Sequence, residues 1–358
     1  MMQVVSRIGS EHFYNYFGEF GLRERTGIDL PGEANSIFHT LSGLGTVELA
    51  TSSFGQRFKV TPLQELTAIA AVANGGYLVS PHLIDRLVDA DGNTVYQYET
   101  QVKRQVVSTE AARTVAAMLE EGVSGTGASR NAYAMGYRIA AKTGTSEKLD
   151  KQDDNGGYSL RIGSCVAFAP YDDPEIAMII VVDEPTTAHY GATVAAPYIS
   201  RMCKATLTHL EYEAVYRADE EAMRAVTVGS YLGMTVDQAK SAIGKLGLAV
   251  DFGDAAGTDV VTGQIPSAGQ SLHLGIGRIL LYTSNAQNDF VSVPNLSGMD
   301  MTAATKKLLD AGLNIRVLGA SKNPATPYPK AATQSIAPKT TVPRGTVVAV
   351  TFLYDDKE

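Results

Sequence analysis

The sequence contains no tryptophan and only two cysteines, Cys165 and Cys203, among its 358 residues. Two such cysteines define no disulfide framework, and neither has the spacing of a metal ligand. We therefore expect both to be plain buried thiols, the usual state of an unpaired cysteine. The six histidines include no pair four residues apart, which argues against a zinc site.

The sequence also lacks concentrated positive charge. Its 30 lysines and arginines are outnumbered by 38 acidic residues, which gives a net charge of −8 without any basic cluster. Nucleic acid is therefore not expected as a partner. The longest uncharged run, 66–84, is broken by Asn74-Gly75-Gly76 and Pro81, so we expect no membrane-spanning helix. No signal peptide is recognisable, and the first residues read as an interior stretch, so the sequence leaves open whether Met1 is the natural start.

What is present fits folded domains. Hydrophobic residues make up 44% of the chain and charged residues 19%, with 34 glycines and 14 prolines but no low-complexity tract. A chain of this length suits two or three domains with turn-rich structure.

Local signals place helices before strands in the first 211 residues. Helix signals are an aromatic stripe that stops near Gly21, a capping box of Thr61 and Gln64, and a cap at Ser108. Strand-like runs follow at 137–143, 161–169 and 175–183, and a closing helix is predicted at 197–211. This order predicts an α+β arrangement with an antiparallel sheet.

An internal repeat begins after an acidic segment, 212–225, which we expect to be a linker. Val226-Thr227-Val228 recurs as Val291-Ser292-Val293 at an offset of 65 residues (291 − 226), and Gly247 recurs as Gly312. After an insertion the register resumes at 70 (334 − 264), where Gln264 recurs as Gln334. Each unit is predicted to hold a strand, a helix capped by Thr235 or Asp300, a glycine in the left-handed region, and further strands.

One short motif carries chemistry. Lys142-Thr143-Gly144-Thr145 follows the apolar run 137–141, which places it at the end of a predicted strand. K-T-G is one of three motifs of serine β-lactamases and penicillin-binding proteins. Lys142 supplies a cation for a carboxylate, Gly144 leaves room for substrate backbone, and Thr145 offers a hydroxyl and an N–H for an oxyanion. Alone the tripeptide is weakly specific, because a lysine entering a glycine turn has the same spelling.

The surroundings of the motif are far more specific. Residues 26–33 read T-G-I-D-L-P-G-E, and residues 55–64 contain G-Q followed by V-T-P-L-Q. Further matches are Gly125-Thr126-Gly127, Phe168-Ala169-Pro170 with Asp173-Pro174, and Tyr190-Gly191 with Ala195-Ala196-Pro197. In this order the segments resemble the transpeptidase domain of class B penicillin-binding proteins. Within them we expect Asp29, Glu33, Gln56 and Thr61 to serve turns and caps rather than chemistry.

The repeats resemble PASTA domains, which have a V-x-V-P start, a G-L after the helix and a Q-x-P before the last strand. The second copy keeps Val293-Pro294, where the first has Gly229; the first keeps Gln264-Ile265-Pro266, which the second blurs. PASTA domains imply binding of uncross-linked muropeptides or β-lactams. A spacer or packing role is favoured here over ligand binding, and both readings stay open.

The resemblance implies an incomplete transpeptidase domain at 1–211, with helices on an antiparallel sheet, and two small α+β PASTA repeats at 226–286 and 291–354. In this family a serine attacks the D-Ala-D-Ala amide of a peptidoglycan stem peptide and passes the acyl group to a neighbouring amine. β-Lactams acylate the same serine. Lys142, Thr143 and Thr145 would bind the terminal carboxylate, with the Thr145 N–H as half of the oxyanion hole.

No metal or organic cofactor is implied by the resemblance. It implies a parent enzyme of the division or sporulation type, anchored in the cytoplasmic membrane, with this region extracellular. Other proteins of cell-wall synthesis would be its partners.

The chain departs from the family where the nucleophile should be. No serine is followed three residues later by lysine, so the S-x-x-K motif is missing. Ser129-Arg130-Asn131 and Ser321-Lys322-Asn323 match S-x-N by spelling only, because they lie outside the family's order. A serine acyl-transfer enzyme needs an activated nucleophile with a base in reach. We therefore expect this chain to be inactive by itself.

Two other interpretations remain open. The main alternative is a non-enzymatic protein that binds cell-wall muropeptides through its PASTA repeats. A PASTA-bearing receptor kinase is disfavoured, because no G-x-G-x-x-G or H-R-D element precedes the repeats.

Overall fold

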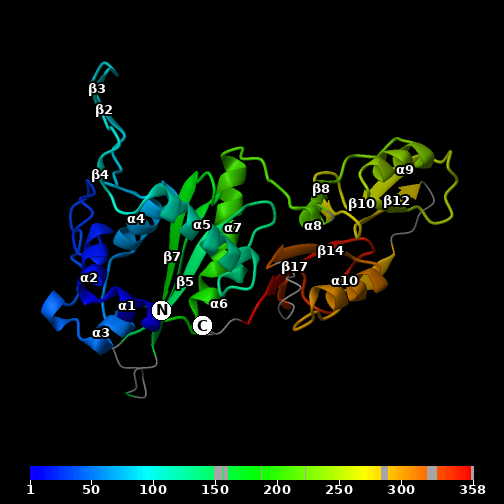
Figure 1. Ribbon diagram of the computed structural model, residues 1–358. Coiled ribbons are helices and arrows are strands. Elements are labelled where there is room, and N and C mark those ends of the chain that lie inside the picture. The colour runs from blue at the N-terminus through cyan, green and yellow to red at the C-terminus, as the bar shows by residue number, and fades with distance from the viewer. Residues whose placement is uncertain are drawn as a thin grey trace. The chain divides into compact units, whose positions relative to one another are not determined.

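The computed structural model describes residues 1–148, 156, 160–186, 188–221, 223–283, 289–320 and 329–355. The chain divides into two compact units. The first combines Met1–Tyr133 with Arg138–Tyr212, and the second combines Ala134–Tyr137 with Glu213–Asp355. The expected fold class is confirmed: helices lie on an antiparallel sheet in the first unit, and two small α+β repeats form the second (Figure 1).

The sheet of the first unit has the order β5-β6-β7, formed by β5 (Ala140–Glu147), β6 (Arg161–Ala169) and β7 (Ile176–Asp183). Both pairings are antiparallel and unbroken. The K-T-G motif lies inside β5 and not at its end, which corrects the sequence-based placement. The strand continues because its polar half stays paired with β6 as far as Glu147, opposite Arg161.

Helices cover both faces of this sheet. On one face, α4 (Pro62–Ala73) and α5 (Thr109–Ser124) pack their apolar side chains against Ala140 and Phe168. On the other face lie α6 (Gly191–Val194) and α7 (Ala196–His209). The predicted capping box of α4 is confirmed, since the Thr61 side chain accepts from the Gln64 N–H and the Gln64 side chain accepts from the Thr61 N–H.

Smaller elements surround this core. They are α1 (Met2–Ile8), α2 (Ser10–Glu19), η1 (Leu41–Gly43), α3 (Thr46–Ser52), β1 (Tyr77–Val79), β2 (Arg86–Val88), β3 (Thr94–Gln97), β4 (Val102–Gln105) and η2 (Arg130–Ala132). The predicted aromatic stripe faces inward, because Phe17 stacks on Phe38 with ring centroids 3.9 Å apart. Strands β2 and β3 form a fully exposed hairpin that projects beside β4 (Figure 1).

Two acidic residues of the T-G-I-D-L-P-G-E segment have structural roles, as expected. Asp29 accepts the backbone N–H groups of Leu83 and Ile84 at 2.8 and 2.9 Å, and these two bonds, led by that from Ile84, hold the pKa of the carboxyl below its usual range. Glu33 accepts the backbone N–H and the hydroxyl of Thr26. Both carboxylates therefore fasten loops.

The second unit contains two copies of one design, preceded by α8 (Ala218–Glu221) within the expected linker. Each copy has a two-stranded ladder, a helix, and a three-stranded sheet with one parallel pair. The first copy has β8 (Ala225–Thr227), α9 (Val236–Lys245), β9 (Ala249–Asp251), β10 (Val261–Ile265), β11 (Ser271–His273) and β12 (Arg278–Thr283). The second has β13 (Phe290–Ser292), α10 (Met301–Asp310), β14 (Asn314–Gly319), β15 (Lys330–Gln334), β16 (Thr341–Pro343) and β17 (Val347–Leu353).

The sequence signals of the repeat have physical causes. Thr235 and Asp300 cap the two helices through side-chain oxygens, and Gly247 and Gly312 have φ angles of 74° and 75°, as predicted. The repeated glutamines make equivalent bonds. Gln264 accepts from the Tyr231 N–H and donates to two carbonyls, and Gln334 does the same with the Leu296 N–H and two carbonyls.

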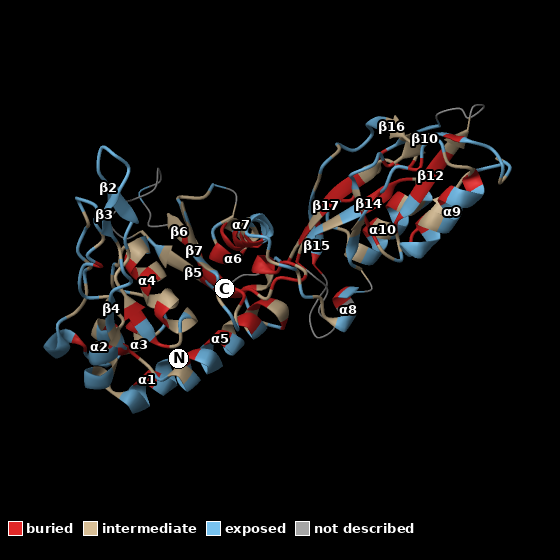
Figure 2. Cartoon of the chain, turned by 90° about the horizontal axis from the view of Figure 1, so that it is seen from above, coloured by how far each residue is buried: buried red, intermediate tan, exposed pale blue. Residues whose placement is uncertain are grey.

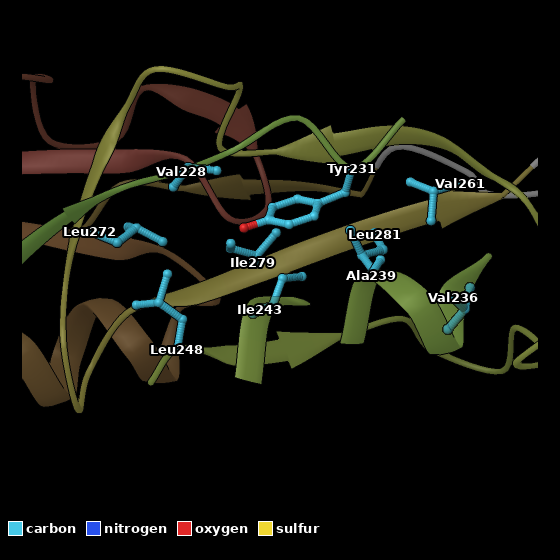
Figure 3. Close-up of a cluster of buried hydrophobic side chains, with 10 residues drawn as sticks. All are labelled: Val228, Tyr231, Val236, Ala239, Ile243, Leu248, Val261, Leu272, Ile279 and Leu281. Atoms are coloured by element: carbon cyan, nitrogen blue, oxygen red, sulfur yellow. The ribbon is translucent and has the colours of Figure 1, made fainter. Parts of the chain in front are cut away.

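Each repeat has its own apolar core. In the first, Tyr231 belongs to one cluster with Ala239 and Ile243 of α9 and Ile279 and Leu281 of β12 (Figure 3). Strand β12 in the first copy and strand β17 in the second contribute buried side chains to these cores (Figure 2).

A polar joint connects the two repeats. Asn314, only 1% exposed, accepts from the Arg278 N–H at 2.9 Å and donates to the carbonyl oxygens of Arg278 and Gly345, each at 2.8 Å. Nearby, His273 Nε2 accepts from the Val317 N–H at 2.9 Å. The equivalent positions in the other copies, Ala249 for Asn314 and Pro343 for His273, cannot make these bonds.

Replacing Asn314 with alanine should weaken the whole second unit. The change leaves one buried and two part-buried backbone groups without this partner. A buried group left unpaired costs about 1–3 kcal/mol, so we expect a loss of roughly 3 kcal/mol in all. Hydrogen exchange of the intact chain measures this as faster exchange in β10 and β12, although the substitution lies in the other repeat.

The matched control is Asn295→Ala, which removes an exposed side chain that accepts only from the Ser297 N–H within its own turn. This variant should leave exchange in β12 unchanged. Equal effects of the two substitutions would contradict an energetic coupling through the joint.

Candidate functional site

The K-T-G-T segment lies on an edge strand, because β5 pairs only with β6 in the described sheet. Alternation along the strand divides its side chains between the two faces of the sheet. Lys142 and Gly144 share the face of Ala140, which α4 and α5 cover. Thr143 and Thr145 share the opposite face, where Gly163, the partner of Thr145 across the ladder, lies against Val194 of α6.

Thr143 is enclosed on the α6–α7 face. Its side chain is 3% exposed, and its hydroxyl has no hydrogen-bond partner among the described residues. The hydroxyl cannot reach a ligand in solvent from this position. Of the four motif residues, only Thr143 is buried.

Lys142 is exposed, and its ammonium group donates to the Thr143 carbonyl oxygen at 2.6 Å. A carboxyl group on α4 lies within its electrostatic reach. Burial raises the pKa of Glu65, and the positive charge of Lys142 offsets part of this rise. Burial therefore favours the protonated form of Glu65, and the charge of Lys142 opposes it.

Thr145 is held by two segments that are distant in sequence. The Gly191 N–H at the start of α6 donates to Thr145 Oγ1 at 3.0 Å, and Gln56 Nε2 donates to the Thr145 carbonyl oxygen at 3.2 Å. Gly191 has no alternative here, since a Cβ atom would lie 2.2 Å from the Ser164 oxygen and 2.4 Å from the Gly144 oxygen. Only glycine permits α6 to approach this closely.

Ion pairs fasten the chain just beyond the motif. Lys148 bonds Asp183 at 2.9 Å and Glu184 at 2.7 Å, and these bonds, led by that to Glu184, raise the pKa of the lysine. The end of β5 is thereby tied to the end of β7, on the far side of the sheet.

The remaining candidates are structural or lie outside the described residues. Asn131 is fully buried and donates to the Ala192 carbonyl oxygen at 2.9 Å, so Ser129-Arg130-Asn131 braces α6. Ser321-Lys322-Asn323 lies outside the described residues. Cys165 and Cys203 are both buried, as predicted, and burial raises the pKa of Cys203 to about 12.

The contact made by Gln56 was not expected, since the sequence indicated only a turn at this residue. The only available signal was the position of G-Q in an ordered series of motifs, and the order of motifs along the chain does not predict contacts between residues.

None of the helices in the described part of the chain has the length and apolar character needed to span a membrane.

The geometry offers one kind of binding surface. Lys142 and Thr145 leave opposite faces of β5, so a ligand can touch both only by lying along the open edge of the strand. The carbonyl groups of Thr143 and Thr145, two residues apart, point to the same side, and both accept from side chains. An extended peptide with a terminal carboxylate fits such an edge, with main-chain groups to pair and a cation nearby.

Known families match both units. A model of the penicillin binding protein transpeptidase domain matches residues 1–204, and the PASTA domain matches residues 226–285 and 291–352.

Curated relatives extend the match. Stage V sporulation protein D of Bacillus subtilis is 34% identical over 285 residues, which are 76% of this chain and 42% of that protein. Penicillin-binding protein 2A of Bacillus subtilis is 35% identical over 48% of this chain and 25% of its own length. The chain spans less than half the length of these relatives.

Solved structures agree with this fold. The transpeptidase domain of penicillin-binding protein 3 from Burkholderia pseudomallei aligns with a TM-score of 0.51 and 29% identity, over 60% of this chain and 61% of that one. Penicillin-binding protein 3 from Mycobacterium tuberculosis, complexed with ampicillin, aligns with a TM-score of 0.53 and 26% identity, over 61% and 50% of the two chains.

Replacing Thr143 with valine should stabilise the first unit. The hydroxyl is buried without a described partner, and a methyl group of similar size removes its desolvation cost, for a gain of about 1 kcal/mol. Urea unfolding of the chain measures the change.

Thr67→Val is the matched control. Thr67 is also buried, but its hydroxyl donates to the Leu63 carbonyl oxygen at 2.7 Å, so its loss should cost about 1 kcal/mol. If both substitutions destabilise the unit equally, Thr143 has a partner and its buried hydroxyl matters.

Proposed function

The chain belongs to the penicillin-binding protein transpeptidase family and carries two PASTA domains, and on this basis we propose that it is part of a peptidoglycan D,D-transpeptidase. The complete enzyme cross-links stem peptides through a serine acyl-enzyme. The single observation that carries the proposal is the K-T-G-T segment on the open edge of β5, with its cation exposed and Thr145 held from two sides.

In this proposal the end of a stem peptide lies alongside β5. Lys142 attracts the terminal carboxylate, and the Thr145 hydroxyl donates to it. Gly144 has no side chain to keep the substrate backbone away from the strand. The Thr145 N–H is half of the oxyanion hole, where a preorganised donor stabilises the charge that develops on the attacked carbonyl oxygen. Thr143 takes part through its backbone.

The nucleophile has to come from a part of the enzyme outside this sequence. Within the 358 residues no serine is followed three residues later by lysine. A serine without a neighbouring base is a weak nucleophile. The chain alone is therefore proposed to provide the substrate-binding strand but not the acylation chemistry.

The parent enzyme is proposed to be anchored in the cytoplasmic membrane, with both described units outside the cell. D-Ala-D-Ala stem peptides are its substrates, and β-lactams compete for the same site, as the ampicillin complex of the Mycobacterium tuberculosis relative supports. The PASTA repeats are proposed to act as spacer or packing modules, with muropeptide binding as their alternative role. Division or sporulation is the proposed setting, in agreement with the sporulation relative.

The 358-residue chain should not be labelled by a fluorescent penicillin. Acylation needs the missing serine and lysine, so no covalent adduct should survive denaturation and gel electrophoresis. A longer version that includes S-x-x-K and S-x-N should be labelled under the same conditions. Labelling of the 358-residue chain at one serine would contradict the proposal that the nucleophile lies outside this sequence. A longer reading frame without these motifs would favour a non-enzymatic wall-binding protein.

Replacing Lys142 with alanine in the complete enzyme should slow acylation. The change removes a charge-assisted contact worth about 1.5–3 kcal/mol, which corresponds to roughly 10–200-fold in rate. Stopped-flow acylation by a chromogenic β-lactam measures it. Lys103→Ala is the control, because this lysine only donates to the Thr26 carbonyl oxygen. An unchanged rate in the Lys142 variant would mean that the motif has no part in binding.

A further inference from the structure

Gln56, which follows α3, makes a long-range contact that the turn at the end of this helix does not need for its own hydrogen bonds. Its amide nitrogen donates to the Thr145 carbonyl oxygen at 3.2 Å, across 89 positions of sequence, and the side chain is half-buried. The acceptor is on the open edge of β5, in the residue whose N–H is proposed to stabilise the oxyanion.

The backbone presents Gln56 in a fixed position. Helix α3 ends with two bonds of the Schellman type, in which the Gly55 N–H donates to the Ser52 oxygen and the Gln56 N–H to the Thr51 oxygen. Gly55 has a φ of 92°, as the left-handed residue of this motif requires.

The residue after Gln56 adds a second restraint. Arg57 has a φ of 65°, an uncommon conformation for a residue other than glycine, and its guanidinium pairs with Glu48 of the same helix at 3.2 Å. Non-glycine residues held in this region often mark functional positions. The two left-handed residues on either side of Gln56 therefore direct its side chain towards β5.

The bond to Gln56 complements the one made by Gly191. Gly191 orients the Thr145 hydroxyl, and Gln56 orients the Thr145 carbonyl group. With two groups of one residue held, the direction of its N–H is restricted as well. A donor that is oriented before reaction stabilises developing charge without reorganisation during the step. The carbonyl oxygen has two lone pairs, so a substrate amide can still use the second.

We propose that Gln56 is a positioning residue for substrate acylation, which acts by donating a hydrogen bond to the Thr145 carbonyl and so holding the oxyanion-binding end of β5. The inference rests on the proposed function for its chemical meaning, but the contact itself can be tested separately.

The first test uses the 358-residue chain and hydrogen exchange at 144–148. Gln56→Met keeps the length of the side chain but removes the donor, and it should speed exchange there by roughly three- to tenfold. The control is Gln101→Met, since Gln101 is exposed and donates only to the Glu99 carbonyl oxygen. Exchange that is unchanged in the Gln56 variant would overturn the proposal.

The second test uses the complete enzyme and separates the donor from mere packing. Q56M should lower the acylation rate constant by roughly three- to tenfold at unchanged melting temperature, with Q101M at the original rate. Q56E has the same shape but cannot donate when ionised. Its rate relative to the original enzyme should be low at pH 7 and should recover as pH falls to about 4.3, where the carboxyl becomes protonated and can donate.

The outcomes distinguish the two proposals. If Lys142→Ala leaves acylation unchanged, the proposed function fails, and hydrogen exchange still decides whether Gln56 holds β5. If Lys142→Ala slows acylation but Q56M does not, the role of Gln56 fails alone. Faster acylation in Q56M would also overturn it, because the amide would then be competing with substrate for the Thr145 oxygen.

Discussion

The unbroken antiparallel pairing of β5 with β6 is the constraint on which the first unit depends. It carries the K-T-G segment through a stretch of polar residues that has little strand propensity of its own, and it leaves the other edge of β5 open. The same register sets Gly144 opposite Ser164 and Thr145 opposite Gly163, which makes the narrow space that Gly191 fills. A shift of one residue would exchange the faces of Lys142 and Thr143 and bury the cation.

Features with local causes were predictable from sequence. The Thr61 capping box and the left-handed glycines after the PASTA helices arise from interactions within a few residues, and the apolar run over 161–169 indicated a strand, although its partners lie far away in the sequence. The hairpin of β2 and β3 also has a local signal, Asp91-Gly92 between two short apolar runs.

What could not be predicted depends on pairing between distant segments. The K-T-G strand extends past its apolar half only because β6 continues beside it, and the Gln56 contact exists only because α3 ends where it does. The motif predicted the same role for Lys142, Thr143 and Thr145, whereas the enclosure of Thr143 follows from the position of α6 and α7. Because Lys142 and Thr145 lie on opposite faces of β5, a peptide can contact both only along the open edge of this strand.

The polar joint in the second unit gives the two repeats an order. Asn314 and His273 each occur once, on opposite copies, so the contact is head-to-tail and joins unlike surfaces. Exchanging the copies would set Ala249 and Pro343 against each other, and neither side chain can form a hydrogen bond. The two copies are therefore no longer interchangeable. A third copy added by recombination could form the same joint only if the two repeats that meet there carried an asparagine and a histidine at these positions.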